Sequence, residues 1–294
     1  MGKRIFSIGG LLLFPFCCFC QTEMWWANNV NWDGRTHWSK YLILAPKYMG
    51  PNALTVPSIN NGSIDSLSSI GFSANAHFSK GDNTQNLMLY GNYTTKQNTI
   101  SVDVQFVPFE TFQLSHEKKT ERKTFYLDYY KNKVVGDVVA NTTIQLLQKK
   151  RDKIQLALRL GIRMPSGGLL TMARYADVPA YWIDIGGGLP FKNSNWKWIG
   201  MAGFLVWQTN IEKHRQDDAI LFGSGFEWNK KGLRLQAYAA GYSGYLNNGD
   251  RPTLVRLNME KRKNKKVYLF RLQQGLHDFA YFSIEAGTRF ILSK

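Results

Sequence analysis

Arginines and carboxylates are the residues of this sequence whose types and spacing could do chemistry together. Seven of each fall on the polar side of segments that alternate between apolar and polar residues. The arginines are Arg159, Arg163, Arg234, Arg256, Arg262, Arg271 and Arg289. The carboxylates are Asp103, Glu117, Asp137, Asp184, Glu227, Glu260 and Glu285. Guanidinium and carboxylate groups form strong bidentate pairs, so this polar side could hold an ion-pair network.

Two interpretations of this charged face stay open. In one, a ladder of arginines lines a polar channel and selects anions. In the other, the charges pair with one another and fill the interior, because unpaired buried charge is penalised heavily. The equal numbers favour pairing. We therefore expect six arginines to face inward, each within reach of a carboxylate: Arg159, Arg163, Arg234, Arg256, Arg271 and Arg289.

Catalytic and metal-binding patterns are weak. A membrane-embedded serine hydrolase needs a Ser and a His side by side on its outer wall. His116 falls on the outward face of its segment, but parity places no outward serine beside it. His77 is isolated on the inner face, and no two histidines have the spacing of metal ligands. We expect no catalytic residue, no metal site and no cofactor, and an enzymatic role is the less favoured alternative.

Two short motifs have structural explanations. Gly186-Gly187-Gly188 lacks the Lys-Ser/Thr of a phosphate loop and lies inside a strand pattern. It predicts a bulge or the close approach of another segment. Asn247-Asn248-Gly249-Asp250 could bind calcium, but these residue types first of all predict a turn.

The elements that must position these residues are strands. Residues 153–164 alternate cleanly, with Ile154, Leu156, Leu158 and Leu160 on one face and charged residues on the other. Several such segments exceed ten residues, long enough to cross a bilayer at a tilt. We predict an all-β fold, a transmembrane antiparallel β-barrel of twelve strands. The strands lie near 67–79, 84–94, 99–117, 133–148, 153–165, 179–189, 196–208, 218–228, 232–245, 253–262, 265–275 and 280–292.

The number of strands depends on Pro108. A proline cannot donate to a ladder, so 99–117 could be two strands, and an added strand near Tyr41–Ala45 would then give fourteen. We prefer twelve, because the in/out parity of 99–117 does not slip across Pro108. Connections alternate between short turns and longer segments, among them 166–178, 209–217 and 246–251. This alternation is typical of outer-membrane barrels, with short turns in the periplasm, where both ends of the barrel would also lie.

The N-terminus predicts export. Lys3 and Arg4 precede an apolar stretch, and Cys18-Phe19-Cys20 supplies small residues for cleavage before Gln21. Acylation of Cys20 is the less favoured alternative. All three cysteines lie in this segment, so the mature chain would have no disulfide, cysteine metal site or cysteine nucleophile. We divide the chain into a signal peptide (1–20), an N-terminal periplasmic or plug segment (21–66) and the barrel (67–294).

The chain resembles Gram-negative outer-membrane barrels. The ending Ser283–Leu292 has the alternation of a last barrel strand. More narrowly, it resembles uncharacterised barrels common in Bacteroidota through Lys47–Leu54, Ala173–Asp177, Tyr242–Pro252 and Gln273–Asp278. This resemblance implies a fold and an outer-membrane location, and it carries no established activity.

The net charge of +16 suggests anionic surroundings. For an exported chain we expect outer-membrane lipid and lipopolysaccharide, not nucleic acid, and lysines in solvated turns are an equal explanation. The expected function is a narrow channel or receptor for a small polar or acidic solute. The alternatives are a structural or assembly component of the envelope and, less favoured, a lipid-modifying enzyme. The sequence does not indicate an oligomeric state.

Overall fold

Antiparallel strands make up most of the computed structural model, which describes residues 25–125, 132–148 and 154–292. The strands are β1 (Ser69–Ser79), β2 (Asp82–Thr94), β3 (Ile100–Leu114), β4 (Lys133–Val134), β5 (Val138–Gln148), β6 (Gln155–Met164), β7 (Ala180–Pro190), β8 (Trp196–Ile211), β9 (His214–Lys230), β10 (Leu233–Ser243), β11 (Thr253–Lys263), β12 (Lys266–His277) and β13 (Phe282–Ile291). The helices are short: residues 25–30, η1 (Trp38–Tyr41), α2 (His116–Glu121) and η3 (Leu170–Met172).

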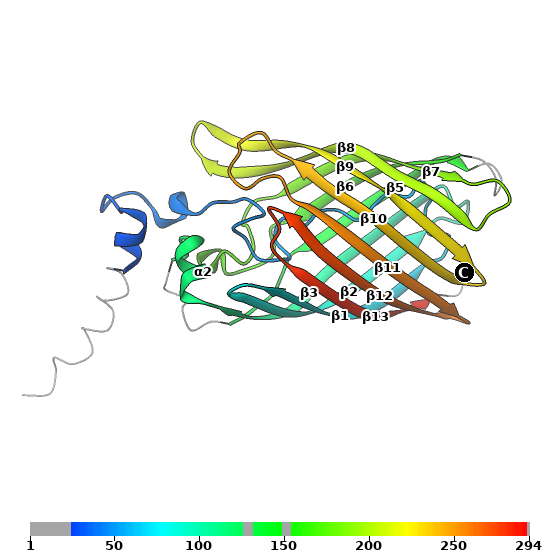
Figure 1. Cartoon of the computed structure of the whole chain (residues 1–294), viewed down its shortest axis with the longest axis horizontal. Coiled ribbons are helices and arrows are strands. Elements are labelled where there is room, and N and C mark those ends of the chain that lie inside the picture. Colours follow the sequence, from blue (N-terminus) through cyan, green and yellow to red (C-terminus); the bar gives the residue numbers. More distant parts are fainter. Residues whose placement is uncertain (1–24, 126–131, 149–153, 293–294) are drawn as a thin grey trace, which may run out of the picture.

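The strands close into a barrel (Figure 1). Neighbours in sequence pair antiparallel, and β1 pairs with β13 from Ser69 opposite Ile291 to Phe78 opposite Phe282. Twelve strands form the ring, and the two-residue β4 is an extra strand on β3 ahead of β5. Closure pairs both sides of each of the twelve ring strands, so none of these strands is left as an open edge. The prediction of a twelve-stranded antiparallel barrel is confirmed, and residues 41–45 contain no strand.

The two faces of each strand follow the alternation in the sequence. In β7, Tyr181, Ile183 and Ile185 are about half exposed on the outside, whereas Trp182 and Asp184 are buried inside. An apolar outside and a polar inside are what a barrel in lipid requires. Among the described residues, no helix is long and apolar enough to cross a membrane.

Parity in β3 does slip at Pro108, contrary to the prediction. Ser101 and Val107 are buried on the inner face, but beyond the proline the buried residues are Glu110 and Phe112. The register with β2 shifts between Leu87 and Leu89. Proline has no N–H for the ladder, so the strand accommodates it in a bulge and continues with its faces exchanged. The strand count stays at twelve, and Glu110 turns inward.

The two ends of the barrel differ. At the turn end, short connections (95–99, 191–195, 231–232 and 264–265) join the strands, and β1 begins and β13 finishes there. At the loop end lie α2 and the longer connections 165–179 and 244–252. The long connection predicted at 209–217 is wrong. β8 and β9 continue as a hairpin to residues 212–213, because their ladder extends as far as Ile211 opposite His214.

Residues 42–66, which we call the lumen segment, run through the inside of the barrel (Figure 1). At the loop end, Asn210 donates to the carbonyl of Leu42 and Trp207 to that of Leu44. At the turn end, Arg289 reaches Asp65. The residues before this segment, 25–41, pack at the loop end, where the Trp26 ring meets Phe125 edge-on at 4.9 Å. The predicted signal peptide, 1–20, lies outside the described residues.

Candidate functional site in the barrel lumen

Three asparagines of the lumen segment donate from Nδ2 to carboxylates of the barrel wall. The bonds run from Asn52 to Glu110 (2.8 Å), from Asn60 to Asp184 (2.9 Å) and from Asn61 to Glu227 (2.7 Å). A hydrogen bond to a charged acceptor contributes about 1.5–3 kcal/mol. The segment is therefore fixed along much of its length by direct bonds to the wall.

The backbone of the segment is also bonded to wall arginines. Arg256 donates to the carbonyls of Val56 (2.8 Å) and Pro57 (3.2 Å), and Arg159 donates to that of Ser58 (2.8 Å). An irregular backbone inside a barrel has no ladder of its own, so its polar groups need such partners. The lumen arginines therefore donate hydrogen bonds to the backbone of the segment as well as to carboxylates of the wall.

The structure brings five of the six predicted arginines to carboxylates. Arg159 is 2.8 Å from Asp184, and Arg271 is 2.9 Å from Glu285. The other pairs are Arg163 with Asp137, Arg234 with Glu260, and Arg289 with both Glu260 and Asp65. Glu227 pairs with Lys197 at 3.0 Å. These charges are paired within the barrel, which removes most of the cost of burying them.

Two of the predicted residues depart from this pattern. Arg256, expected next to a carboxylate, donates instead to Oε1 of Gln273 (2.6 Å) and to the lumen-segment carbonyls. Asp103 accepts from Asn141 (2.9 Å) and has no ion pair within the described part of the chain. Parity gives the face of each strand, but the rotation and offset of neighbouring strands decide which charges meet.

Three further expectations fail at strand ends. Arg262 is exposed at the turn end, and Glu117 is exposed in the first turn of α2. His116 opens α2 and packs against Trp25 with tilted rings whose centroids are 4.8 Å apart, so it is not part of an outer strand face. His77 is buried and bonds Ser283 (2.8 Å) and Asn86 (2.9 Å). The described residues contain no group of three or more His, Cys, Asp or Glu that could hold a metal ion.

A cluster at the loop end was missed by sequence reasoning. The fully buried Arg174 lies 2.8 Å from Asp82 and 2.7 Å from Glu110. Arg122 also contacts Asp82 (2.7 Å) and donates to the Tyr281 hydroxyl (2.7 Å). Both arginines come from connections, which have no periodicity to indicate burial. For Arg174 the one available signal was its place in Ala173–Asp177, a segment that was singled out from the sequence on resemblance alone.

Burial and charge act in opposite directions on Arg174. Burial disfavours its cation, but the carboxylates of Glu110 and Asp82 outweigh burial and raise the pKa of the guanidinium. Burial raises the pKa of the Tyr175 hydroxyl well above its usual value, and the nearby Glu110 carboxylate raises it further. Tyr175 accordingly stays protonated and donates to Glu110 at 2.6 Å.

The glycine triplet marks a close approach, as its sequence suggested. A Cβ on Gly186 would lie 2.1 Å from Cγ of Asn60, so the lumen segment occupies the space of a side chain there. A Cβ on Gly187, which is on the other face of β7, would meet nothing nearer than 4.0 Å. Gly186 is therefore required by the contact between the wall and the segment.

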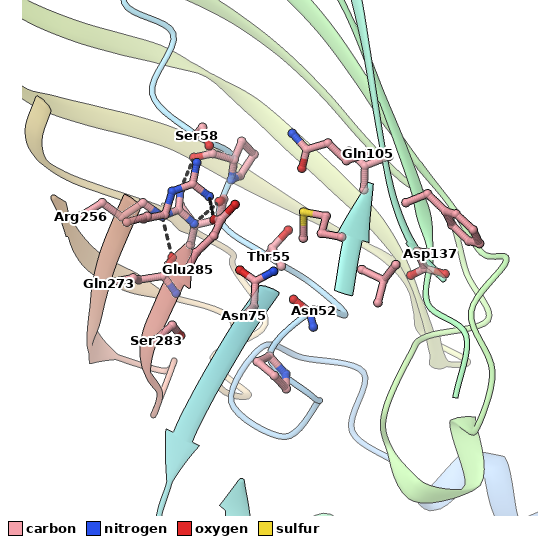
Figure 2. A pocket seen from close by; sticks show the side chains of 18 of the residues that line it. Asn52, Thr55, Ser58, Asn75, Gln105, Asp137, Arg256, Gln273, Ser283 and Glu285 are labelled. Carbon is pink, nitrogen blue, oxygen red and sulfur yellow. Dashed lines mark hydrogen bonds and ion pairs between the residues drawn. The ribbon is translucent and has the colours of Figure 1, made fainter. Parts of the chain in front are cut away.

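Space remains beside the lumen segment in two adjoining cavities, of about 240 and 260 Å³. Ser58, Asp103, Arg159, Arg271 and Glu285 line both of them. Figure 2 shows a lumenal pocket that is lined by Thr55 and Ser58 of the segment and by Asn75 and Gln273 of the wall. The cavities follow one another through the barrel and are lined mainly by polar side chains.

The comparisons with known proteins agree with this architecture. An outer membrane channel from Pseudomonas putida F1 superposes with a TM-score of 0.57 at 11% identity, over 81% of this chain and 100% of that one. The NanC porin superposes with a TM-score of 0.52 at 9% identity, over 76% and 100%. No protein-family model and no curated protein matches the sequence. The fold is that of Gram-negative outer-membrane barrels, which supports the expected outer-membrane location.

Proposed function

We propose that the chain is a narrow outer-membrane channel for small polar solutes, constricted by its own lumen segment. The observation that carries this proposal is the pair of adjoining polar cavities beside a segment that is bonded to the wall. The cavity volumes suit a solute of a few heavy atoms, or water and ions that pass in single file. The segment would act as a plug that narrows the lumen.

The balance of charge favours polar solutes over strongly anionic ones. The first cavity is lined by three arginines and three carboxylates: Arg159, Arg256, Arg271, Asp103, Asp137 and Glu285. The second has four of each: Arg159, Arg234, Arg271, Arg289, Asp65, Asp103, Glu260 and Glu285. Mixed charges at close quarters leave no uniform field to steer one sign of ion. The printed descriptions of the two similar structures, a channel and a porin, are in keeping with passage.

Single-channel recording in planar bilayers tests the proposal. The unmodified protein should give a small conductance, and a variant lacking residues 25–66 should give one several-fold larger. A heat-modifiable shift on unboiled gels would show that the shortened barrel still closes. If the folded, shortened barrel conducts nothing, passage is wrong, and the structural or assembly component of the envelope becomes the better explanation. The lipid-modifying enzyme remains the least supported alternative, since His116 lies in α2 beside Trp25.

The orientation follows from the two ends. We propose that the turn end faces the periplasm. Residues 25–41, at the loop end, would then lie outside the cell, although β1 begins and β13 ends on the periplasmic side. The mature chain would have no cysteine, which permits single-cysteine labelling of intact cells. A membrane-impermeant thiol reagent should label Arg35→Cys at the loop end and spare Lys192→Cys at the turn end. The reverse pattern would overturn the orientation.

The remaining parts of the proposal concern export and origin. We propose cleavage before Gln21, which the intact mass of the purified protein would check. A mass that retains residues 1–20, or one with acyl chains on Cys20, would contradict it. We also propose that the chain is related to the Bacteroidota barrels that it resembles through Lys47–Leu54 and Tyr242–Pro252, and that outer-membrane lipid and lipopolysaccharide surround it.

A further inference from the structure

Two buried carboxylates at the loop end have no ion pair with any residue that the structure describes. Eight Asp and Glu side chains are buried in the described residues, and six of them pair with an arginine or lysine: Asp82, Glu110, Asp137, Asp184, Glu227 and Glu285. The other two, Asp217 and Asp250, are 0% and 1% exposed and have no ion pair in that part of the chain. An unpaired buried charge is costly, so these two require an explanation.

The two carboxylates face the same point in space. Asp217 lies near the start of β9, and Asp250 lies in the connection between β10 and β11. The Oδ2 atoms of both lie 2.7 Å from the position that a Cβ on Gly244 would take. Glycine at 244 leaves this space open. Two like charges brought this close repel one another unless a cation lies between them or they share a proton.

Both aspartates, and Asn248 two residues before Asp250, have side-chain oxygens without a partner. Asp217 Oδ2, Asp250 Oδ1 and Asn248 Oδ1 are buried and have no hydrogen-bond partner. Each aspartate uses its other oxygen for a backbone N–H, Asp217 Oδ1 from Tyr245 (3.1 Å) and Asp250 Oδ2 from Asn247 (2.9 Å). The local backbone therefore holds the carboxylates in place while their second oxygens stay free to bind.

The neighbouring charges do not neutralise the pair. Arg251 is exposed, and its Nε donates to the Gly244 carbonyl (3.4 Å). Asp218 points outward and accepts from Gln216. Lys47 contributes its backbone N–H to the Gly249 carbonyl (3.2 Å), which joins this connection to the lumen segment.

We propose that Asp217, Asp250 and Asn248 form a calcium site at the loop end of the barrel. The donors are all oxygens, two carboxylates and an amide, and calcium accepts such mixed sets with water and carbonyls completing six to eight ligands. Zinc prefers nitrogen and sulfur, and magnesium demands a stricter octahedron. Two carboxylates suit the weak affinity of extracellular calcium modules, with Kd of about 0.1–1 mM. The ion would pin the β10–β11 connection to β9, and through Gly249 to the entry of the lumen segment.

Isothermal titration calorimetry with calcium chloride tests the site on the EDTA-stripped full chain in detergent. The unmodified protein should bind one calcium per chain, and Asp218→Asn should bind it equally well. Asp217→Asn and Asp250→Asn should each weaken binding at least tenfold. No saturable binding by the unmodified protein, as expected if the two carboxylates merely share a proton, would overturn the proposal. Equal binding by Asp217→Asn and Asp250→Asn would do the same.

Thermal stability gives a second measurement, and it does not require that every variant folds well. EDTA should lower the temperature of the heat-modifiable shift of the unmodified protein, and calcium should restore it more fully than magnesium. Asp250→Asn should be insensitive to EDTA, because it no longer holds two facing charges. If EDTA leaves the unmodified protein unchanged, the site does not exist. Conductance is not measured, so this outcome is separate from that of the proposed channel.

Discussion

Nδ2 of Asn60 lies 2.9 Å from Oδ1 of Asp184, and this bond joins the lumen segment to the barrel wall. Asp184 is also bonded by Arg159, so the amide and the guanidinium share one carboxylate. The bond crosses 124 positions of sequence. It is one of several bonds that hold the segment in the lumen.

Asn60→Asp should loosen the lumen segment. The substitution keeps the shape of the side chain and replaces the donor amide by a carboxylate that faces Asp184, so an attractive contact becomes a repulsive one. Losing a bond to a charged acceptor costs about 1.5–3 kcal/mol. Channel recordings should show a larger or noisier conductance. Asn193→Asp, in an exposed turn, is the matched control, and equal behaviour of the two variants would argue against the segment as a constriction.

The glycine triplet offers a comparison between adjacent positions. Gly186→Ala places a methyl group 2.1 Å from Cγ of Asn60 and should displace the segment, at a cost of about 1–3 kcal/mol. Gly187→Ala, with 4.0 Å of clearance, should stay within about 0.5 kcal/mol of the unmodified protein. Conductance and the temperature of the heat-modifiable shift should both change for Gly186→Ala alone. A similar change in both variants would point to the strand rather than to the segment.

Arg174→Met should destabilise the loop end strongly. It leaves Glu110 buried with no cation, and Asp82 with Arg122 alone. Breaking a buried ion pair by removing one partner costs about 3–5 kcal/mol. Denaturant unfolding should show a lower free energy of unfolding for Arg174→Met. Arg174→Lys should recover only part of that stability, because an ammonium cannot span both carboxylates as a guanidinium does. Exposed Arg215→Met is the control and should be close to neutral. An unfolding midpoint for Arg174→Met like that of the control would contradict this account.

Asp103→Asn should shift ion preference toward anions. Asp103 lines both cavities and has no ion pair in the described part of the chain, so its removal leaves each cavity with one excess arginine. The reversal potential in a salt gradient measures the change. Glu212→Gln, in the exposed turn between β8 and β9, should leave the reversal potential unaltered. An unchanged potential in Asp103→Asn would show that ions do not pass through these cavities.

The sequence by itself determined the strands and their faces. Alternate residues of a barrel strand face lipid and the polar lumen, so apolar and polar residues alternate along it. This alternation was enough to locate β6, β7 and β13 in the sequence. The sequence also predicted a carboxylate within reach of six inward arginines, and the structure pairs five of them, with Arg256 as the exception. The glycine triplet also predicted the close approach of another segment, because glycines within a strand leave the space of a side chain free.

Tertiary structure alone decided what fills the lumen. Residues 42–66 have no periodicity, because their bonds run to several different strands of the wall: Asn61 donates to Glu227 across 166 positions, and Arg256 donates to Val56 across 200. The bulge at Pro108 turned Glu110 inward, where Arg174 could meet it, and no pattern in either neighbourhood encodes that meeting. Local alternation in the sequence predicts whether a residue faces lipid or the lumen. Which residue it meets across the lumen depends on how the whole ring of strands closes.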